Sequence, residues 1–213
     1  MKNPFESHTK RYDDWFDHHK ALYESEVNAI RSVLPPFNRA LEIGTGTGRF
    51  SIPFGITEGI EPTAAMRQIA QRRGINVTEG VGEYLPFDAD TYDLVLMITT
   101  ICFVDNPQKV CAEAWRVLKS GGRFVVGFVD RESFLGKKYE LHRAESPFYQ
   151  DAHFFSVADL SEMMTRVGFN GYTYNQTLFQ DLKEIQSVEP VKTGYGQGGF
   201  VVIATQKNSG EKQ

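Results

Sequence analysis

Apolar residues recur every three or four positions in the first part of the chain, which is the spacing of one face of an α-helix. The repeating positions are Trp15, Phe16, Leu22, Tyr23, Val27, Ile30 and Val33. The pattern predicts an amphipathic helix over residues 14–34. Pro35-Pro36 follows and ends it, because proline cannot continue a helix.

Beyond residue 38, short apolar runs alternate with helical patterns. The predicted strands lie at residues 39–43, 55–60, 75–78, 92–98 and 123–129, and the predicted helices at residues 63–73 and 107–119. The run YDLVLMI (92–98) is apolar at nearly every position, as in a strand buried on both faces. The alternation predicts right-handed β-α-β crossovers and a mainly parallel sheet with helices on both faces.

The alternation stops after Asp130. Residues 131–155 are polar and aromatic without a clear period, and we interpret them as an insertion. Ser156 then begins a helix, with Asp159 as its capping partner and Gly168 at its end. Closing strands are expected at residues 171–178 and 199–205, followed by a disordered tail at residues 207–213.

Composition and charge narrow the class of protein. The 213 residues suit a single domain, and the net charge of −4 disfavours a nucleic-acid-binding surface. No apolar run approaches the ~20 residues of a membrane span, and the N-terminus lacks the apolar stretch of a secretory signal. Two cysteines do not suggest a disulfide framework. We therefore expect a cytoplasmic protein that binds neither nucleic acid nor membranes.

Two glycine-rich stretches are candidates for ligand binding, LEIGTGTG (41–48) and GYGQGG (194–199). A ligand-binding glycine turn follows a strand and opens a helix, because the ligand uses the helix N-terminus. GYGQGG matches the dinucleotide pattern G-x-G-x-x-G but precedes a strand, so we interpret it as a turn. LEIGTGTG follows the first strand of the sheet, yet Arg49 stands where the dinucleotide pattern has its third glycine.

Acidic residues at the strand ends indicate the kind of ligand. Glu42 precedes the first glycine, Glu61 ends the second predicted strand, and Glu83 follows the third. Strand ends of this kind converge on the crevice where doubly wound sheets bind ligands. Three carboxylates would repel a pyrophosphate, and they suit a ligand with a cationic centre, an ammonium group and ribose hydroxyls. S-adenosylmethionine has these groups and no phosphate.

Four ordered segments within residues 38–130 resemble the motifs of class I S-adenosylmethionine-dependent methyltransferases, a family that includes enzymes acting on small molecules such as quinone precursors. LEIGTGTG is similar to the first motif, and GIEPTAAM (59–66) to the acidic second-strand motif. GVGEYLPFDADTYDLVL (80–96) resembles the G-D-A-E-x-L-P-F stretch, and EAWRVLKSGG (113–122) resembles E-x-x-R-V-L-K-P-G-G. The four motifs in order at this spacing are highly specific.

The resemblance implies a Rossmann-like, doubly wound α/β fold. Its mainly parallel sheet would have seven strands and an antiparallel last strand, with an N-terminal helical cap and an insertion after the fifth strand. The chain would form one methyltransferase domain over residues 1–213. Its parts would be a cap (1–36), a cofactor-binding core (37–130), a cap insertion (131–155), a C-terminal helix with strands (156–206) and a tail (207–213).

The resemblance also implies a site for S-adenosylmethionine, with S-adenosylhomocysteine as the product. The cofactor-binding residues would be Glu42, Gly44, Thr45, Gly46, Gly48, Glu61, Pro62, Met66, Gly82, Glu83, Ile98, Thr99 and Thr100. The glycine turn would pass under the methionine part, where Glu42 would hold the loop or meet the amino group. Glu61 would accept hydrogen bonds from the two ribose hydroxyls.

The remaining residues of this set would surround the adenine ring and the reacting methyl group. Pro62 and Met66 could pack against adenine, although for Met66 plain core packing is an alternative. Gly82 and Glu83 would flank the ring, and residues 98–100 would line the floor near the methyl group. Val81 replaces an aspartate that often contacts the adenine amino group in the family, so recognition would rest on the backbone near Gly82 and on Glu83.

Aromatic residues gather in the N-terminal segment and in the insertion, the two parts expected to cover the crevice. We predict that Trp15, Phe16 and Tyr149 contact a small, partly apolar acceptor. A general base is needed only if the acceptor is protonated, and His19 and Tyr12 are the candidates. His18 and His19 are adjacent rather than one helical turn apart, so we expect no metal site. The oligomeric state would be a monomer or a homodimer.

Two other functions stay open at this point. A nicotinamide-dependent (NAD(P)) oxidoreductase could use a related sheet, although Arg49 and Glu42 disfavour it. A protein that binds S-adenosylmethionine without catalysis would keep the same cofactor residues and lack an acceptor site.

Overall fold

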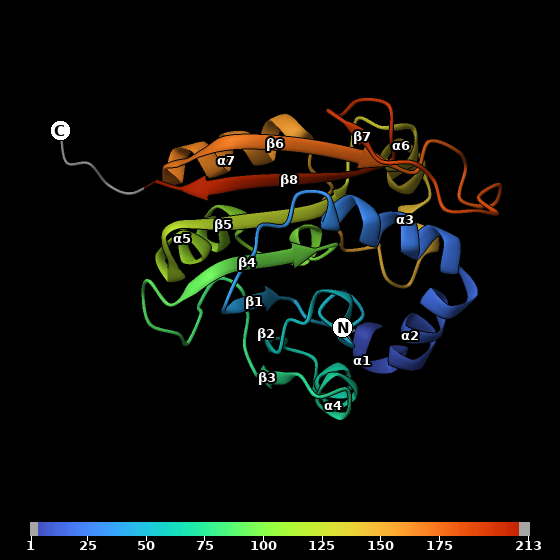
Figure 1. Cartoon of the computed structure of the whole chain (residues 1–213). Coiled ribbons are helices and arrows are strands. Elements are labelled where there is room, and N and C mark those ends of the chain that lie inside the picture. The colour runs from blue at the N-terminus through green and yellow to red at the C-terminus, as the bar shows by residue number, and fades with distance from the viewer. Residues whose placement is uncertain (1–3, 209–213) are drawn as a thin grey trace.

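The apolar runs of the sequence pair into one sheet, which the computed structural model describes for residues 4–208 (Figure 1). The strands are β1 (Ala40–Ile43), β2 (Glu58–Ile60), β3 (Asn76–Thr78), β4 (Tyr92–Ile98), β5 (Leu118–Val129), β6 (Phe169–Thr177), β7 (Lys192–Thr193) and β8 (Phe200–Lys207). Their order is β3-β2-β1-β4-β5-β8-β6-β7. β1 to β5 are parallel and β8 is antiparallel to both β5 and β6, so the predicted mainly parallel sheet with an antiparallel last strand is confirmed.

Helices cover both faces of this sheet. They are α1 (Pro4–Ser7), α2 (Thr9–His18), α3 (Lys20–Arg31), α4 (Ala64–Arg72), α5 (Pro107–Val117), α6 (Phe134–Leu141) and α7 (Val157–Val167), with 3-10 turns η1 (Ile52–Phe54), η2 (Ile101–Phe103) and η3 (Arg143–Glu145). α3 lies on one face, while α5 and α7 lie on the other (Figure 1). The apolar strands are thus covered on one face by α3, from the N-terminal segment, and on the other by α5 and α7, which connect strands.

The core divides into two clusters, one on each face. Val95 and Met97 of β4 pack with residues of α5 and α7 in the first cluster. Leu94, Leu96 and Ile98 of the same strand pack with residues of α3 in the second. This alternation follows from the period of two in a strand and confirms that YDLVLMI is buried on both faces.

Several predicted boundaries are wrong, for identifiable reasons. The single helix over residues 14–34 is broken at His19, whose backbone is not helical (φ −118°, ψ 47°), into α2 and α3. The apolar period continues across the break, so the pattern does not reveal it. The helix predicted to end at residue 119 ends at Val117, and β5 takes up the segment before Gly121-Gly122 with a register irregularity.

The insertion and the C-terminal part also differ in detail. Residues 131–155 contain α6 and η3, and the Ser133 side chain caps α6 by accepting from Gly136 N. An eighth, two-residue strand, β7, pairs with β6 beside the seven predicted ones. β8 extends to Lys207, so the disordered tail that we predicted to begin at residue 207 is wrong at that residue. Residues 209–213 of the predicted tail lie outside the described part of the chain.

Two local predictions are confirmed. Ser156 and Asp159 form a reciprocal capping box at the start of α7, and Gly168 ends that helix in the left-handed conformation (φ 112°). GYGQGG is a turn between β7 and β8, where the Gln176 Oε1 atom accepts from the N–H groups of Gln197 and Gly198. This second glycine cluster therefore shapes the chain before β8.

Candidate functional site

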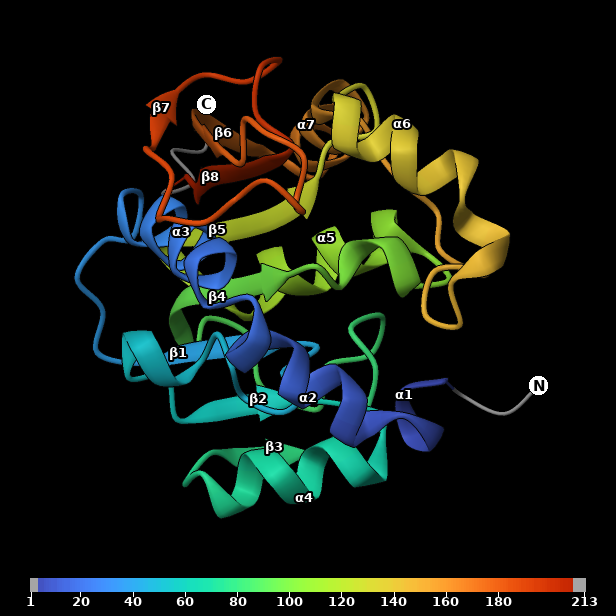
Figure 2. The same cartoon turned by 90° about the vertical axis from the view of Figure 1, so that its right-hand side faces the viewer.

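A cavity of about 860 Å³ lies at the carboxyl ends of β1, β2 and β4. Figure 2 looks at this end of the sheet, where α1, α2 and the segment around α6 gather. Most of the predicted site residues line the cavity: Tyr12, Trp15, Phe16, Gly44, Gly46, Glu61, Pro62, Met66, Gly82, Glu83, Thr99, Thr100 and Tyr149. The remaining ones, His19, Glu42, Thr45, Gly48 and Ile98, are not part of its lining.

The backbone of the glycine turn adopts a conformation that favours glycine at three positions. Gly44, Gly46 and Gly48 have φ values of 71°, 55° and 87°, in the left-handed region. A Cβ on Gly44 would lie 2.2 Å from Thr100 Cγ2, so side chains at this position are excluded by contact as well as by conformation. The N–H groups of Gly44 and Thr45 donate to Ile60 O, at 2.9 and 3.1 Å, and tie the turn to β2.

Glu61 lies beneath this turn and is 5% exposed. Its carboxylate accepts from Gly46 N at 3.0 Å and from Thr63 N at 2.9 Å. Burial raises the pKa of Glu61, and these N–H donors partly offset the increase. A carboxylate has about four lone-pair sites, so Glu61 keeps acceptor capacity toward the cavity that it lines.

Glu42 is buried and is not part of the cavity lining. Its carboxyl accepts from the Ser51 hydroxyl, and Thr45 Oγ1 donates to its backbone oxygen at 3.0 Å. Burial raises the pKa of Glu42 to about 8. Of the two roles predicted for this residue, the geometry favours holding the loop.

Glu83 lines the cavity, but its carboxylate already has partners. It accepts from the N–H groups of Asp105 and Asn106 at 2.8 and 3.1 Å, in the turn before α5. Val81, two residues before Glu83, also lines the cavity and is 41% exposed. Glu83 thus positions the loop between β4 and α5 at the rim.

The end of β4 bends sharply into the cavity. Thr99 has a φ of 49°, which is uncommon for a β-branched residue, and its N–H donates to Gly127 O at 2.7 Å. The Thr100 hydroxyl donates to Ile98 O at 2.9 Å. Non-glycine residues held in this conformation cluster at binding sites.

Aromatic rings from distant segments meet over the cavity. Phe5 of α1 lies 5.0 Å from Phe103 and 5.4 Å from Phe148, between ring centroids, and Tyr12 lies 6.2 Å from Phe148. Tyr149 stacks on Tyr139 of α6 at 4.9 Å. The N-terminal helices and the insertion therefore form one aromatic roof.

The two predicted base candidates occupy different environments. Tyr12 is half-buried in the lining, and desolvation together with the nearby carboxylates, first Glu61, raises its pKa well above the usual range. Its hydroxyl stays protonated at neutral pH, which suits a hydrogen-bond donor better than a base. His19 is exposed outside the cavity, where it stacks on Trp15 at 4.6 Å and its Nδ1 lies 2.9 Å from Trp15 O.

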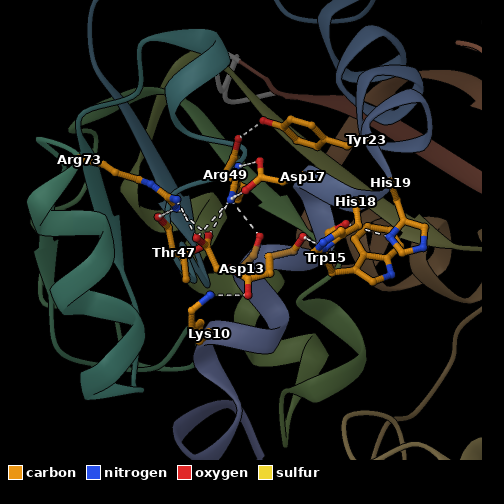
Figure 3. Close-up of polar contacts among 11 residues, drawn as sticks. Lys10, Asp13, Trp15, Asp17, His18, His19, Tyr23, Thr47, Arg49 and Arg73 are labelled. Atoms are coloured by element: carbon orange, nitrogen blue, oxygen red, sulfur yellow. Dashed lines mark hydrogen bonds and ion pairs between the residues drawn. The ribbon is translucent and has the colours of Figure 1, made fainter.

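An ion-pair network that the sequence pattern did not reveal fastens α2 to the glycine turn. Asp13 of α2 lies 2.9 Å from Arg49 Nε and 2.8 Å from Arg73 Nη1, and accepts from the Thr47 hydroxyl at 2.7 Å (Figure 3). Asp17 pairs with Arg49 at 2.8 Å. Arg49, which departs from the dinucleotide glycine pattern, thus bridges the turn to both acidic residues.

Glu26 of α3 is a second residue that the sequence analysis missed. It lines the cavity, is 6% exposed, and burial raises its pKa to about 8. A signal was present, because Leu22, Glu26 and Ile30 follow one another at four-residue intervals on the apolar face of the helix. A charged residue within such a stripe marks a position that packing alone does not explain.

Other site types have no support in the described part of the chain. Residues 4–208 hold no group of three His, Cys, Asp or Glu side chains that could bind a metal ion. The helices described for these residues include none that is long and apolar enough to cross a membrane.

Comparisons with known proteins agree on one family. The family described as "Methyltransferase domain" matches residues 41–126. A crystal structure of an S-adenosylmethionine-dependent methyltransferase from Thermotoga maritima, described as a "possible histamine N-methyltransferase", is 46% identical, covers 96% of this chain and 98% of that one, and has a TM-score of 0.93. An uncharacterized protein of Methanocaldococcus jannaschii is 44% identical over 96% of this chain and 99% of its own length. Demethylmenaquinone methyltransferase of Renibacterium salmoninarum is 31% identical over 51% of this chain and 47% of its own length.

Proposed function

Because the chain belongs to the family of S-adenosylmethionine-dependent methyltransferases, we propose that it transfers a methyl group to an O, N or C atom of a small, partly apolar acceptor bound in the described cavity. The observation that carries this proposal is the buried Glu61 carboxylate, which supports the glycine turn through Gly46 N and faces the cavity. The Thermotoga relative, the possible histamine N-methyltransferase, makes small amines one class of acceptor to test.

The residues present fit the cofactor. The glycine turn lines the cavity at Gly44 and Gly46, and the buried carboxylates favour a cation over a phosphate. Glu61 would accept from the ribose hydroxyls through its free lone pairs. Pro62 and Met66, both in the lining, would pack against adenine, with the backbone near Gly82 beside it.

Catalysis by this chain would rest on alignment and exclusion of water. When bound, S-adenosylmethionine supplies a methyl group on a sulfonium, which is a good leaving group. The chain holds the acceptor in line by the aromatic roof and the bend at Thr99-Thr100. The aromatic roof would shield the nucleophile from water. Tyr12 would orient the acceptor by donating its hydroxyl hydrogen, and the exposed position of His19 argues against a role as base.

The experiment measures release of S-adenosylhomocysteine with a panel of phenols, imidazoles including histamine, and primary amines. Glu61→Gln should raise the KM for S-adenosylmethionine at least tenfold, because it removes the charge and places an amide donor against the N–H groups of Gly46 and Thr63. Glu79→Gln is the matched control, since Glu79 is exposed and, like the Glu61 backbone, contacts Arg67.

The outcomes separate the three functions. Turnover on any panel member with the expected Glu61 effect supports methyl transfer. Tight binding of S-adenosylhomocysteine without turnover across the panel would favour a non-catalytic binding protein. If the Glu61 and Glu79 variants had the same KM for S-adenosylmethionine, Glu61 would not be a cofactor-binding residue.

A further inference from the structure

The cavity continues from the glycine turn into an apolar chamber, and Glu26 stands in the wall of that chamber. Many lining residues in this part, such as Phe16, Leu22, Leu135 and Leu178, belong to the hydrophobic cluster on the α3 face of the sheet. Glu26 is 6% exposed among them. A carboxyl group in such a wall loses most of its hydration.

Glu26 differs from the other buried carboxylates of the described lining by having no partner. Glu61 and Glu83 each accept from two backbone N–H groups. Within residues 4–208, neither a hydrogen bond nor an ion pair reaches the Glu26 carboxyl, and burial alone accounts for its raised pKa. A buried polar group without a partner is rare and calls for a ligand or a functional reason.

Tyr12, Tyr139 and Tyr149 line the same cavity as this carboxyl. Burial raises the pKa values of Tyr12, Tyr139 and Tyr149, and the charge of Glu26 adds to the increase at each. The three phenols, one from α2 and two from the insertion, thus share the cavity with Glu26 and stay neutral. Aromatic rings that line a cavity, as these and that of Phe16 do, can attract a cation in the same space.

We propose that the methyl acceptor is a small organic amine whose ammonium group donates to the Glu26 carboxylate, while its apolar or aromatic part fills the chamber between α3 and α6. The ammonium ion supplies the donors and the charge that Glu26 lacks, and the bond between the two ions is of the stronger, charge-assisted kind. The inference rests on the proposed function, and it specifies the substrate class of the same cavity.

A titration with matched amines and alcohols tests this assignment. The probes are 2-phenylethylamine and 3-methylbutylamine, each compared with its neutral isostere, 2-phenylethanol and 3-methylbutanol. Calorimetry of the full chain, with and without S-adenosylhomocysteine, should show the amines binding at least tenfold more tightly than the alcohols. Glu26→Gln should remove that preference while leaving the affinity for S-adenosylhomocysteine unchanged.

Glu24→Gln is the matched control on the same helix, because Glu24 is half-exposed and pairs with Lys20. It should keep the preference for amines. Equal binding of amines and alcohols by the wild type, no binding of either amine, or an unchanged preference in Glu26→Gln would overturn the assignment. Failure of S-adenosylhomocysteine to bind would instead contradict the proposed function, since the amine titration without cofactor still reports on Glu26.

Discussion

Glu26, Glu42 and Glu61 are buried carboxyl groups whose surroundings set different roles. Glu61 has two N–H donors, Glu42 has the Ser51 hydroxyl, and Glu26 has the open space of the chamber. The number of donors decides how much charge each group tolerates without a ligand. The two N–H donors thus favour the anionic form of Glu61 against the effect of its burial, whereas Glu26 gains most from a bound cation.

Because Glu26 has different pKa values in the folded and unfolded states, it makes the free energy of unfolding depend on pH. Its folded pKa of about 8 exceeds the usual 4.5, so the folded state binds more protons than the unfolded state between these values. Stability from this group is therefore present below pH ~4.5 and is lost as the pH rises through about 8. Glu26→Gln removes the effect.

We accordingly expect Glu26→Gln to raise Tm by roughly 3 °C or more at pH 8.5 and by less at pH 5.5. Differential scanning calorimetry of the ligand-free protein at both pH values measures this. Glu42 has a raised pKa in the same range, but it is present in both the wild type and Glu26→Gln, so its contribution to the difference in Tm cancels. A difference in Tm that does not grow with pH would show that the Glu26 carboxyl is solvated.

The glycine turn allows a sharp test, because Gly44 and Gly55 share a φ of about 70° but differ in space. A Cβ on Gly55 meets nothing within 4 Å, while one on Gly44 would lie 2.2 Å from Thr100 Cγ2. Gly55→Ala should cost about 1 kcal/mol in the free energy of unfolding from backbone conformation. Gly44→Ala should cost about 3 kcal/mol or more because the clash adds.

Urea unfolding measures both costs, and calorimetry measures binding of S-adenosylhomocysteine. Binding should weaken in Gly44→Ala and stay unchanged in Gly55→Ala. Equal losses of stability in the two variants would mean that Thr100 moves aside readily.

At the scale of single residues, the sequence predicted those whose position follows from the end of a strand. Glu61 and Gly44 come directly after strands, so the convergence of strand ends places them in the crevice. Asp13 was not predictable, because its partners Arg49 and Arg73 lie 36 and 60 residues away. The position of Glu26 on the apolar face of its helix was visible in the sequence. The chamber that it lines was not, because that chamber includes residues from α6 and from later segments.

At the scale of elements, the docking of α2 decides how the glycine turn is covered. The break at His19 lets α2 run along the turn, where Asp13 meets two guanidinium groups. These contacts hold the pKa of Asp13 well below its usual range despite burial. α2 is thus fastened to the cofactor side of the cavity through one carboxylate.

Asp13→Asn should lower the free energy of unfolding by about 2–4 kcal/mol, because it leaves Arg49 and Arg73 without their shared partner. It should also raise the KM for S-adenosylmethionine as α2 loosens. Asp17→Asn is the control: Asp17 is 67% exposed and pairs with Arg49 at the surface, so Tm should hardly change. Urea unfolding and steady-state kinetics check both variants, and similar losses would contradict a special role for Asp13.

Element prediction succeeded where local signals were strong. The capping box at Ser156 and the uniform apolar run of β4 defined their elements. It failed where tertiary contacts override the pattern, as at the break before α3 and at the early start of β5. α6 was missed because its apolar residues do not form one stripe: Leu135 and Tyr139 line the cavity, whereas Phe134 and Leu141 are exposed.

At the scale of the whole molecule, the sheet order brings the N-terminal helices and part of the C-terminal half to one cavity, which both line. β8 and β6 place the C-terminal half beside α3, and the insertion after β5 meets α1 and α2 above the strand ends (Figures 1 and 2). The roof contacts of Phe5 with Phe103 and Phe148 join three segments that are far apart in sequence. The crossover rules predicted the sheet, whereas the roof depends on side-chain packing.

Calorimetric titration of the full chain with S-adenosylhomocysteine and, separately, with NADH tests the central claim most directly. The buried carboxylates and the glycine turn should give micromolar or tighter binding of S-adenosylhomocysteine at one site per chain, and no heat with NADH. Glu61→Gln should weaken the first titration. Binding of NADH without binding of S-adenosylhomocysteine would contradict the account.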